Sequence, residues 1–292
     1  MSDFKTRNRQ NVNIGPLSVG DGHPVAIVAE LGVNHLGDFG RMKEMIHAAH
    51  ENGADLLKFQ TYIAEDRYDA KNNPKGQAFI DLLAEWQFSR DQEAELWEYA
   101  RSINATVFTS PFDEASVEFA DSLGSVAYKL AAFEVVNLKL VRAIARKGKP
   151  VVLSRGMTNK SELDACLKVL DEHKVQYVIL HTISSYPLQM KDSHLRMIST
   201  LRELYDCPVG HSDHTPGTDV PPLAIAAGAN MIEKHFTVNP KLRESDNFFS
   251  ITGDDLRKIV FDARETERIL GSGNMVKIDT EDYMWDFRRH TE

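Results

Sequence analysis

The sequence predicts one (β/α)₈ barrel with a short N-terminal hairpin or loop extension. Eight short apolar runs alternate with amphipathic stretches along the 292 residues, which is the order expected of repeated strand–helix units. The runs are rich in Val, Ile and Leu, as in parallel strands that are buried on both faces. A doubly wound open sheet is the alternative, but no glycine fingerprint follows the first run.

One strand is expected at each apolar run. The runs are residues 25–31, 56–62, 106–112, 126–132, 150–156, 177–183, 208–213 and 231–237. Helical patterns lie between them, for example at 39–52, where Asp38 is the expected N-cap. A second helix is expected at 159–172, because Asn159 and Glu162 have the spacing of a capping box.

This repeat divides the chain into three parts. Residues 1–24 form an N-terminal extension, in which 11–24 are expected to cover the lower end of the barrel. Residues 25–270 form the catalytic TIM barrel, and the polar residues 271–292 form a C-terminal tail. No apolar run approaches the roughly 18 residues of a membrane span, and the polar start of the chain predicts no signal peptide. We therefore expect the protein to be located in the cytoplasm.

The composition restricts the partners. The net charge is −9, and such an acidic surface argues against nucleic acid and anionic membranes, which select basic patches. An anionic substrate must therefore be held by locally placed cations. Two cysteines, Cys166 and Cys207, are too few for a disulfide framework and are expected to be reduced.

Two lysines interrupt the apolar strands. Lys58 and Lys129 lie in different runs, and a closed parallel barrel has no edge at which a lysine could reach water. Such side chains reach solvent only at the mouth, where two of them would bind a phosphate or a carboxylate. The alternative is that they form ion pairs with Glu30, Glu134 or Glu233; both arrangements can hold together.

Two histidines close the last two strands. His214 and His235 would enter the same mouth and are candidate ligands of a divalent transition metal that keeps open positions for water and substrate. The alternative is a pair of hydrogen-bonded core histidines. Glu30 ends the first strand and is a candidate general base, or alternatively the ion-pair partner of Lys58. Serines at other strand ends line a polar pocket or serve as helix N-caps.

The sequence contains, in order, the blocks AELGVNHLGD, GADLLKFQTY, TSPFD, AYKLAAFE, SSYP, VGHSDHTPG and GANMIEKHFT. With this series it resembles the N-acetylneuraminate (sialic acid) synthase family. The resemblance extends from about residue 13 to residue 270. It implies condensation of phosphoenolpyruvate with the open-chain aldehyde of N-acetylmannosamine or a related aldose. The products would be a 2-keto-3-deoxy sugar acid and phosphate, and the metal would be manganese, with magnesium or cobalt accepted.

The resemblance also implies residue roles. The implied catalytic residues are Glu30 and the two metal ligands His214 and His235. The implied phosphoenolpyruvate-binding residues are Lys58, Ser110, Lys129, Ser154 and Ser212. The implied acceptor-sugar residues are Gln60, Glu134, Ser184, Tyr186 and Asp246.

Several positions depart from the family pattern. Ala132 and Phe133 replace a serine and a glycine of YKIASGE, so a hydroxyl near phosphoenolpyruvate is lost. Arg155 replaces the threonine of LSTGM and is expected to add a cation for phosphoenolpyruvate; alternatively it faces the outer helices. The loop that contains Asp246 reads ESDNF where the family has GPDH.

The end of the chain is a further departure. Many relatives continue into an antifreeze-like domain that lends an arginine to a partner subunit's acceptor site, and we expect this chain to lack that domain. A homodimer would then need another interface, and another group must take the place of that arginine, unless 271–292 supplies it.

Other functions fit less well. A 3-deoxy-octulosonate or heptulosonate synthase would use a sugar phosphate and needs an arginine clamp, for which only Arg155 and Arg243 are candidates. A non-catalytic sugar-binding barrel would need neither the lysines nor the histidine pair. A phosphosugar isomerase is a more distant alternative.

Overall fold

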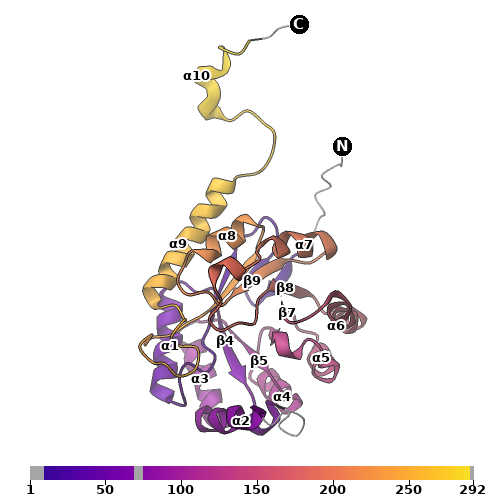
Figure 1. Ribbon diagram of the computed structural model, residues 1–292, viewed down its shortest axis with the longest axis vertical. Helices are drawn as coiled ribbons and strands as arrows, with labels where there is room; N and C mark the ends of the chain where they lie inside the picture. The colour runs from indigo at the N-terminus through magenta and orange to yellow at the C-terminus, as the bar shows by residue number, and fades with distance from the viewer. Residues whose placement is uncertain (1–9, 69–74, 290–292) are drawn as a thin grey trace.

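A computed structural model describes residues 10–68 and 75–289. Eight parallel strands close into a barrel in the order β10-β3-β4-β5-β6-β7-β8-β9, with helices around the outside (Figure 1). Each predicted run contains one strand, so the predicted fold class is confirmed. The strands are β3 (Ala26–Glu30), β4 (Leu56–Thr61), β5 (Val107–Pro111), β6 (Tyr128–Leu130), β7 (Val151–Arg155), β8 (Tyr177–His181), β9 (Val209–Asp213) and β10 (Met231–His235).

Helices follow the strands. They are α1 (Phe39–Glu51), α2 (Lys75–Trp86), α3 (Arg90–Ser102), α4 (Glu114–Ser122), α5 (Leu138–Ala145), α6 (Lys160–Glu172), α7 (Arg196–Leu204), α8 (Val220–Ala226) and α9 (Gly253–Leu270). Both helix starts predicted from caps are confirmed. Asp38 accepts a hydrogen bond from the Arg41 amide, and Asn159 and Glu162 form the capping box of α6.

Short 3₁₀ helices occupy several loops. They are η1 (Ala64–Asp66), η2 (Ala132–Glu134), η3 (Met190–Asp192) and η4 (Asp279–Glu281). Unlike the other strands, β4 is followed by two α-helices, α2 and α3, before the next strand begins. The extra helix α2 contributes side chains to the lining of the cavity at the barrel mouth.

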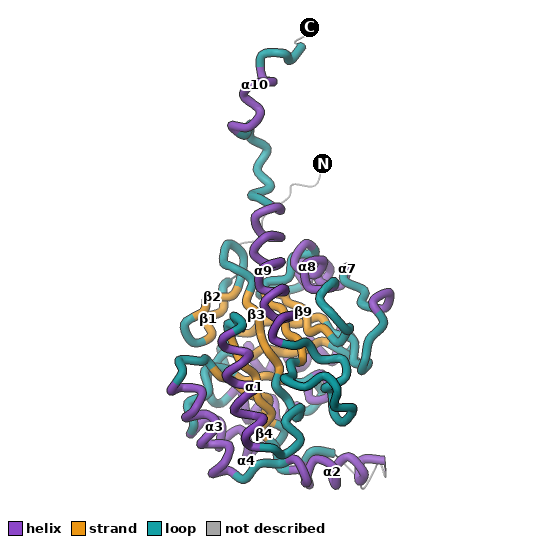
Figure 2. The backbone as a smooth tube through the Cα atoms, turned by 90° about the vertical axis from the view of Figure 1, so that its left-hand side faces the viewer, coloured by secondary structure: helices purple, strands orange, loops and turns teal. Residues whose placement is uncertain are grey.

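The N-terminal hairpin fills one end of the barrel. The strands β1 (Val12–Ile14) and β2 (Leu17–Val19) pair antiparallel, which confirms the predicted hairpin. Their buried side chains belong to one apolar cluster with residues at the beginnings of the strands, such as Ala26 and Leu56. Figure 2 shows the hairpin and α2 at opposite ends of the barrel. The lower interior is therefore apolar, and polar side chains gather at the carboxyl ends of the strands.

Beyond α9 the chain extends away from the barrel, and the short helix α10 (Asp282–Trp285) lies in this extension (Figures 1 and 2). Large apolar side chains in the extension are exposed, among them Met275, Tyr283 and Phe287. Within the described part of the chain, none of the helices has both the length and the apolar composition that crossing a bilayer requires.

Candidate active site at the barrel mouth

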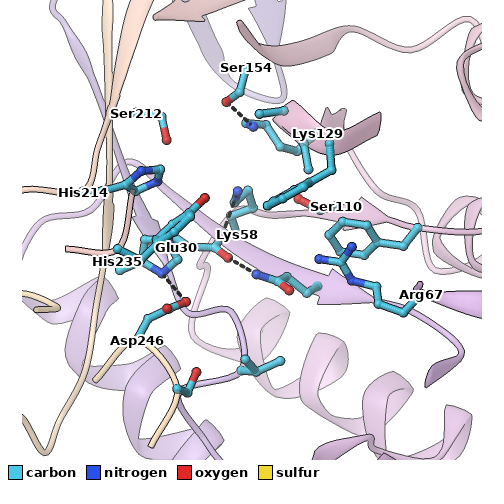
Figure 3. Close-up of a pocket in the computed structure, with 18 of the residues that line it drawn as sticks. Glu30, Lys58, Arg67, Ser110, Lys129, Ser154, Ser212, His214, His235 and Asp246 are labelled. Carbon is cyan, nitrogen blue, oxygen red and sulfur yellow. Dashed lines mark hydrogen bonds and ion pairs between the residues drawn. The ribbon is translucent and has the colours of Figure 1, made fainter. Parts of the chain in front are cut away.

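A cavity of about 650 Å³ opens at the carboxyl ends of the strands. Its polar lining contains all the predicted site residues except Glu134, Arg155 and Ser184. The predicted residues that line it are Glu30, Lys58, Gln60, Ser110, Lys129, Ser154, Tyr186, Ser212, His214, His235 and Asp246. Figure 3 shows most of them pointing toward one shared space.

Strand alternation and register explain this convergence. Glu30 on β3 is paired in register with Lys58 on β4 and with His235 on β10. On the other side of β10, Glu233 is paired with Ser212 on β9. Because alternate residues of a strand face the same side, Glu233 and His235 both point into the barrel. The central residues of the site therefore come from adjacent, rigid strands.

A buried charge network lies at the base of the cavity. The Nζ atom of Lys58 lies 3.1 Å from Oε2 of Glu30 and 3.2 Å from Oε2 of Glu233. Nζ of Lys129 donates a 2.6 Å hydrogen bond to Oγ of Ser154 and lies 4.0 Å from Oε1 of Glu233. The two lysines thus face the cavity and also pair with carboxylates, as both alternatives from the sequence allow.

Polar neighbours fix the two carboxylates in place. Gln60 Nε2 donates a 2.7 Å hydrogen bond to Oε1 of Glu30, and Ser212 Oγ donates a 2.9 Å hydrogen bond to Oε1 of Glu233. Glu233 was not among the predicted site residues. Its signal was present in the sequence, because it precedes His235 by two positions on a strand and must share its face.

The environment separates the pKa values of these groups. Burial raises the pKa of Glu30 to about 7, and nearby Glu233 adds to this, while Lys58 opposes it. Burial would also raise the pKa of Glu233, but the ammonium groups of Lys129 and Lys58 lower it to about 2. Burial lowers the pKa of Lys129 to about 8. Near neutral pH the cluster therefore has two cations, one fixed carboxylate and one carboxyl group able to exchange a proton.

The two histidines meet at the same mouth. The ring centres of His214 and His235 are 5.5 Å apart. Nδ1 of His214 donates a 2.8 Å hydrogen bond to the Ile183 carbonyl, which leaves Nε2 with its lone pair. Burial lowers the pKa of His214 to about 4 and places the pKa of His235 well below its ordinary value. Both imidazoles are therefore neutral, which is the form that binds metals.

This donor set fits a metal held by few protein ligands. Nδ1 of His235 is buried and has no hydrogen-bond partner in the described part of the chain, although Oδ2 of Asp246 lies 3.3 Å away. Among the described residues, no three His, Cys, Asp or Glu side chains are grouped so that they could hold an ion. A divalent ion at His214 and His235 would take its remaining ligands from water and substrate oxygens, which leaves it open for chemistry.

Arg155 is a correction to the prediction. It follows inward-facing Ser154 on β7, so alternation turns it toward the outside of the barrel, and it does not line the cavity. It lies next to His181 in register and close enough to Tyr205, after α7, to affect its pKa. The geometry agrees with the alternative of an arginine among the outer elements.

Two predicted acceptor residues also lie outside the cavity lining. Glu134 is on η2 at the rim, where it accepts a 2.8 Å hydrogen bond from Asn137 and lies 4.0 Å from Nη1 of Arg67. Ser184 has a buried hydroxyl without a hydrogen-bond partner among the described residues. Both belong to loops after strands, where the path of the chain is not set by alternation.

One wall of the cavity was missed by sequence reasoning. It is mainly apolar and aromatic and contains Arg67, Tyr68, Phe79, Leu82, Leu83, Trp86 and Phe112. Most of these residues lie on η1, on α2 or close to them. The signal was the long interval between the second and third strand runs, which is filled by one helix more than the repeat needs.

Known proteins resemble this chain over most of its length. The NeuB family matches residues 45–275. An uncharacterized protein of Methanocaldococcus jannaschii is 35% identical over 93% of this chain and 80% of its own length. The N,N'-diacetyllegionaminic acid synthase of Legionella pneumophila is 34% identical over 87% of this chain and 76% of its own. The N-acetylneuraminate-9-phosphate synthase of Mus musculus is also 34% identical, over 87% of this chain and 73% of its own.

Solved structures show the same relationship. The sialic acid synthetase of Leptospira borgpetersenii, in complex with citrate, has a TM-score of 0.90 at 31% identity and covers 96% of both chains. A truncated 3-deoxy-D-arabino-heptulosonate 7-phosphate synthase of Thermotoga maritima has a TM-score of 0.71 at 18% identity, over 90% of this chain and 94% of its own, which shows the fold alone. The chain therefore belongs to the NeuB family, whose members are phosphoenolpyruvate-condensing transferases that make sialic and related nonulosonic acids.

Proposed function

We propose that this protein condenses phosphoenolpyruvate with the aldehyde of an open-chain aldose similar to N-acetylmannosamine, releasing phosphate and a 2-keto-3-deoxy sugar acid. The observation that carries the proposal is the meeting of two buried lysines and a pair of neutral histidines in one cavity. Membership of the NeuB family supports the same reaction type.

Phosphoenolpyruvate would be held by Lys58 and Lys129. It carries a carboxylate and a phosphate, and both ammonium groups face the cavity beside the hydroxyls of Ser110, Ser154 and Ser212. Charge-assisted hydrogen bonds from such donors are among the strongest that a protein makes. Because Glu233 stays anionic between the lysines, it holds both ammonium groups near the base of the cavity before the substrate arrives.

The aldehyde would lie at the histidine pair. A divalent cation held there, manganese or alternatively magnesium or cobalt, supplies Lewis-acid polarisation of a carbonyl oxygen. The protein's part is to fix the donors: the Ile183 carbonyl orients His214, and the ring of Tyr186 packs on it with centres 4.2 Å apart. The aldehyde carbon is thereby presented to C3 of phosphoenolpyruvate.

Glu30 would move the proton of the attacking water. The electrons of the C2–C3 double bond of the donor form a new bond from C3 to the aldehyde carbon, whose oxygen takes up a proton, and C2 is left with a positive charge. Water then adds to C2 and gives its proton to Glu30, whose pKa of about 7 suits a group that accepts and returns protons. The tetrahedral intermediate collapses when the bond between C2 and the phosphate oxygen breaks, leaving a ketone and free phosphate.

The cavity gives less support to a sugar-phosphate synthase. Such an acceptor needs an arginine clamp, and of the arginines in the described chain only Arg67 lines the cavity. Neither Arg155 nor Arg243 does so. A non-catalytic sugar-binding role would leave the buried lysines and the neutral imidazole pair without a purpose.

The test is phosphate release from phosphoenolpyruvate in the presence of manganese and a panel of aldoses. We expect stoichiometric phosphate and a 2-keto acid with at least one N-acylated aldose, and none when the sugar is omitted. Release that does not depend on the sugar, or no release with any sugar, would contradict the proposal.

A further inference from the structure

Arg67 is a buried cation in the apolar wall of the cavity. It follows η1, and only 9% of its side chain is exposed. Its Cζ lies 3.2 Å from the ring centre of Phe112 and 5.2 Å from that of Tyr68. Its Nε is buried and has no hydrogen-bond partner among the described residues. A buried guanidinium costs free energy when its N–H groups are left unpaired. Because Arg67 lines the cavity, an acceptor that approaches the guanidinium from the cavity would lower this cost.

The position of Arg67 indicates which part of a ligand it would meet. In Figure 3, Arg67 lies across the pocket from His214 and His235, with Glu30 and Lys58 between them. If the aldehyde lies at the histidine pair, as in the function proposed above, Arg67 faces the substituents of the sugar that are remote from the aldehyde.

The local charge disfavours a phosphate at this end. Oε1 of Glu134 lies 4.0 Å from Nη1 of Arg67, so the single guanidinium is already partly neutralised. A phosphate dianion there would meet one shared cation and one carboxylate. An uncharged carbonyl oxygen would accept a hydrogen bond from the guanidinium without that repulsion.

The surroundings favour an acyl group beside that carbonyl. Arg67 stacks on Phe112, which belongs to one apolar cluster with Leu83 and Trp86. Phe79 and Leu82 on α2 also line the cavity. Phe79 and Leu82 are 54% and 39% exposed, so apolar surface remains open to a ligand. The methyl of an acetamido group, or a deoxy terminal carbon, would cover this surface.

We propose that Arg67 determines acceptor specificity, binding the carbonyl of an uncharged acylamino group at the end of the sugar remote from the aldehyde. This rests on the proposed function and deepens it. The preferred acceptor is then an aldose with a second acylamino group away from the aldehyde, such as a 2,4-diacetamido-2,4,6-trideoxyhexose, and a 6-phosphorylated sugar is disfavoured.

The test compares three acceptors with the wild type and with R67M and R67K. The acceptors are 2,4-diacetamido-2,4,6-trideoxymannose, N-acetylmannosamine and N-acetylmannosamine 6-phosphate. For the wild type we expect kcat/KM to be highest for the diacetamido sugar. Met keeps the packing on Phe112 but removes the donor, so R67M should raise the KM of that sugar at least about tenfold, the scale of one charge-assisted hydrogen bond.

The other measurements separate this role from alternatives. The KM of phosphoenolpyruvate should change less than about threefold in R67M, R67K should recover only part of the loss, and R257A, on the exposed face of α9, should leave both KM values unchanged. An equal rise in the KM of phosphoenolpyruvate would overturn the proposal in favour of a donor site. A wild-type preference for the 6-phosphate that R67M removes would overturn it in favour of a phosphate site.

Binding without turnover distinguishes this inference from the proposed function. Calorimetric titration with the diacetamido sugar, in the absence of phosphoenolpyruvate, should show weaker binding by R67M than by the wild type. Unchanged affinity would overturn the role of Arg67 whatever the turnover assay shows. Absence of phosphate release with every sugar contradicts only the proposed function.

Discussion

Glu30 and Lys58 face each other from neighbouring strands, with Nζ of Lys58 3.1 Å from Oε2 of Glu30 at the base of the cavity. Although this cation lowers the pKa of Glu30, burial outweighs it and raises the pKa from 4.5 to about 7. The pairing thus orients the carboxyl group without fixing it as a carboxylate. That combination is what a proton-transfer residue needs.

Replacing Glu30 by Gln should therefore separate binding from turnover. The amide keeps the shape of the side chain but cannot take a proton from water, so we expect turnover to fall at least about a hundredfold, the usual scale of general acid–base help. Binding of phosphoenolpyruvate, measured by calorimetry, should stay nearly unchanged. E114Q, on the surface helix α4, serves as the control. Near-normal turnover in E30Q would remove Glu30 from this role.

Replacing either His214 or His235 by Ala should weaken metal binding. Each supplies one of the two imidazole donors at the mouth, and a lost ligand should lower the affinity for manganese at least about tenfold. Manganese titration monitored by electron paramagnetic resonance measures this without turnover. H173A, an exposed histidine at the end of α6, should bind manganese like the wild type. Unaltered affinity in H214A and H235A would place the metal elsewhere.

Lys129 should make phosphoenolpyruvate binding depend on pH. Burial lowers its pKa to about 8 in the free protein, so raising the pH above this value removes the cation that the donor needs. The dissociation constant should therefore increase from pH 8 to pH 9.5 in the wild type. K129R stays charged throughout this range, and its dissociation constant should change much less. Parallel profiles for the two proteins would assign the titration to another group.

Outside the cavity, Glu93 should make the free energy of unfolding depend on pH. Burial raises its pKa from 4.5 to about 7, against the hydrogen bond donated by Thr61 and the charge of Arg90. The fold therefore favours the protonated form. Its contribution to stability is complete below pH 4.5 and is lost as the pH rises through 7.

The variant E93Q tests this sign. Its free energy of unfolding relative to the wild type should rise between pH 5 and pH 8, by at most about 3 kcal/mol, because the amide carries no charge at either pH. Urea unfolding at both pH values measures the difference. A difference that is the same at pH 5 and pH 8 would mean that Glu93 titrates normally in the folded protein.

The strands and their inward-facing residues could be predicted from the sequence because both follow simple periodicities. Buried parallel strands give continuous apolar runs, and a polar residue inside such a run has to face the mouth. This reasoning finds Lys58, Lys129 and the histidine pair. Applied consistently, it also finds Glu233 through His235 and turns Arg155 outward from Ser154.

The positions of the loop residues were harder to predict from the sequence. Glu134 and Ser184 lie after the ends of strands, where no periodicity specifies direction, and the structure places them beside the cavity lining. Arg67 is brought into the cavity by η1 and stacked on Phe112, a residue far from it in sequence. Contacts of this kind depend on tertiary packing and leave no local pattern in the chain.

The fate of the bridging oxygen of phosphoenolpyruvate tests the central claim most directly. With donor labelled by ¹⁸O between C2 and phosphorus, and an N-acylated aldose as acceptor, mass spectrometry of the products shows which bond breaks. Condensation at this cavity predicts that the label leaves with phosphate while the new ketone oxygen comes from water. Label retained in the organic product, with solvent oxygen in the phosphate, would contradict the account.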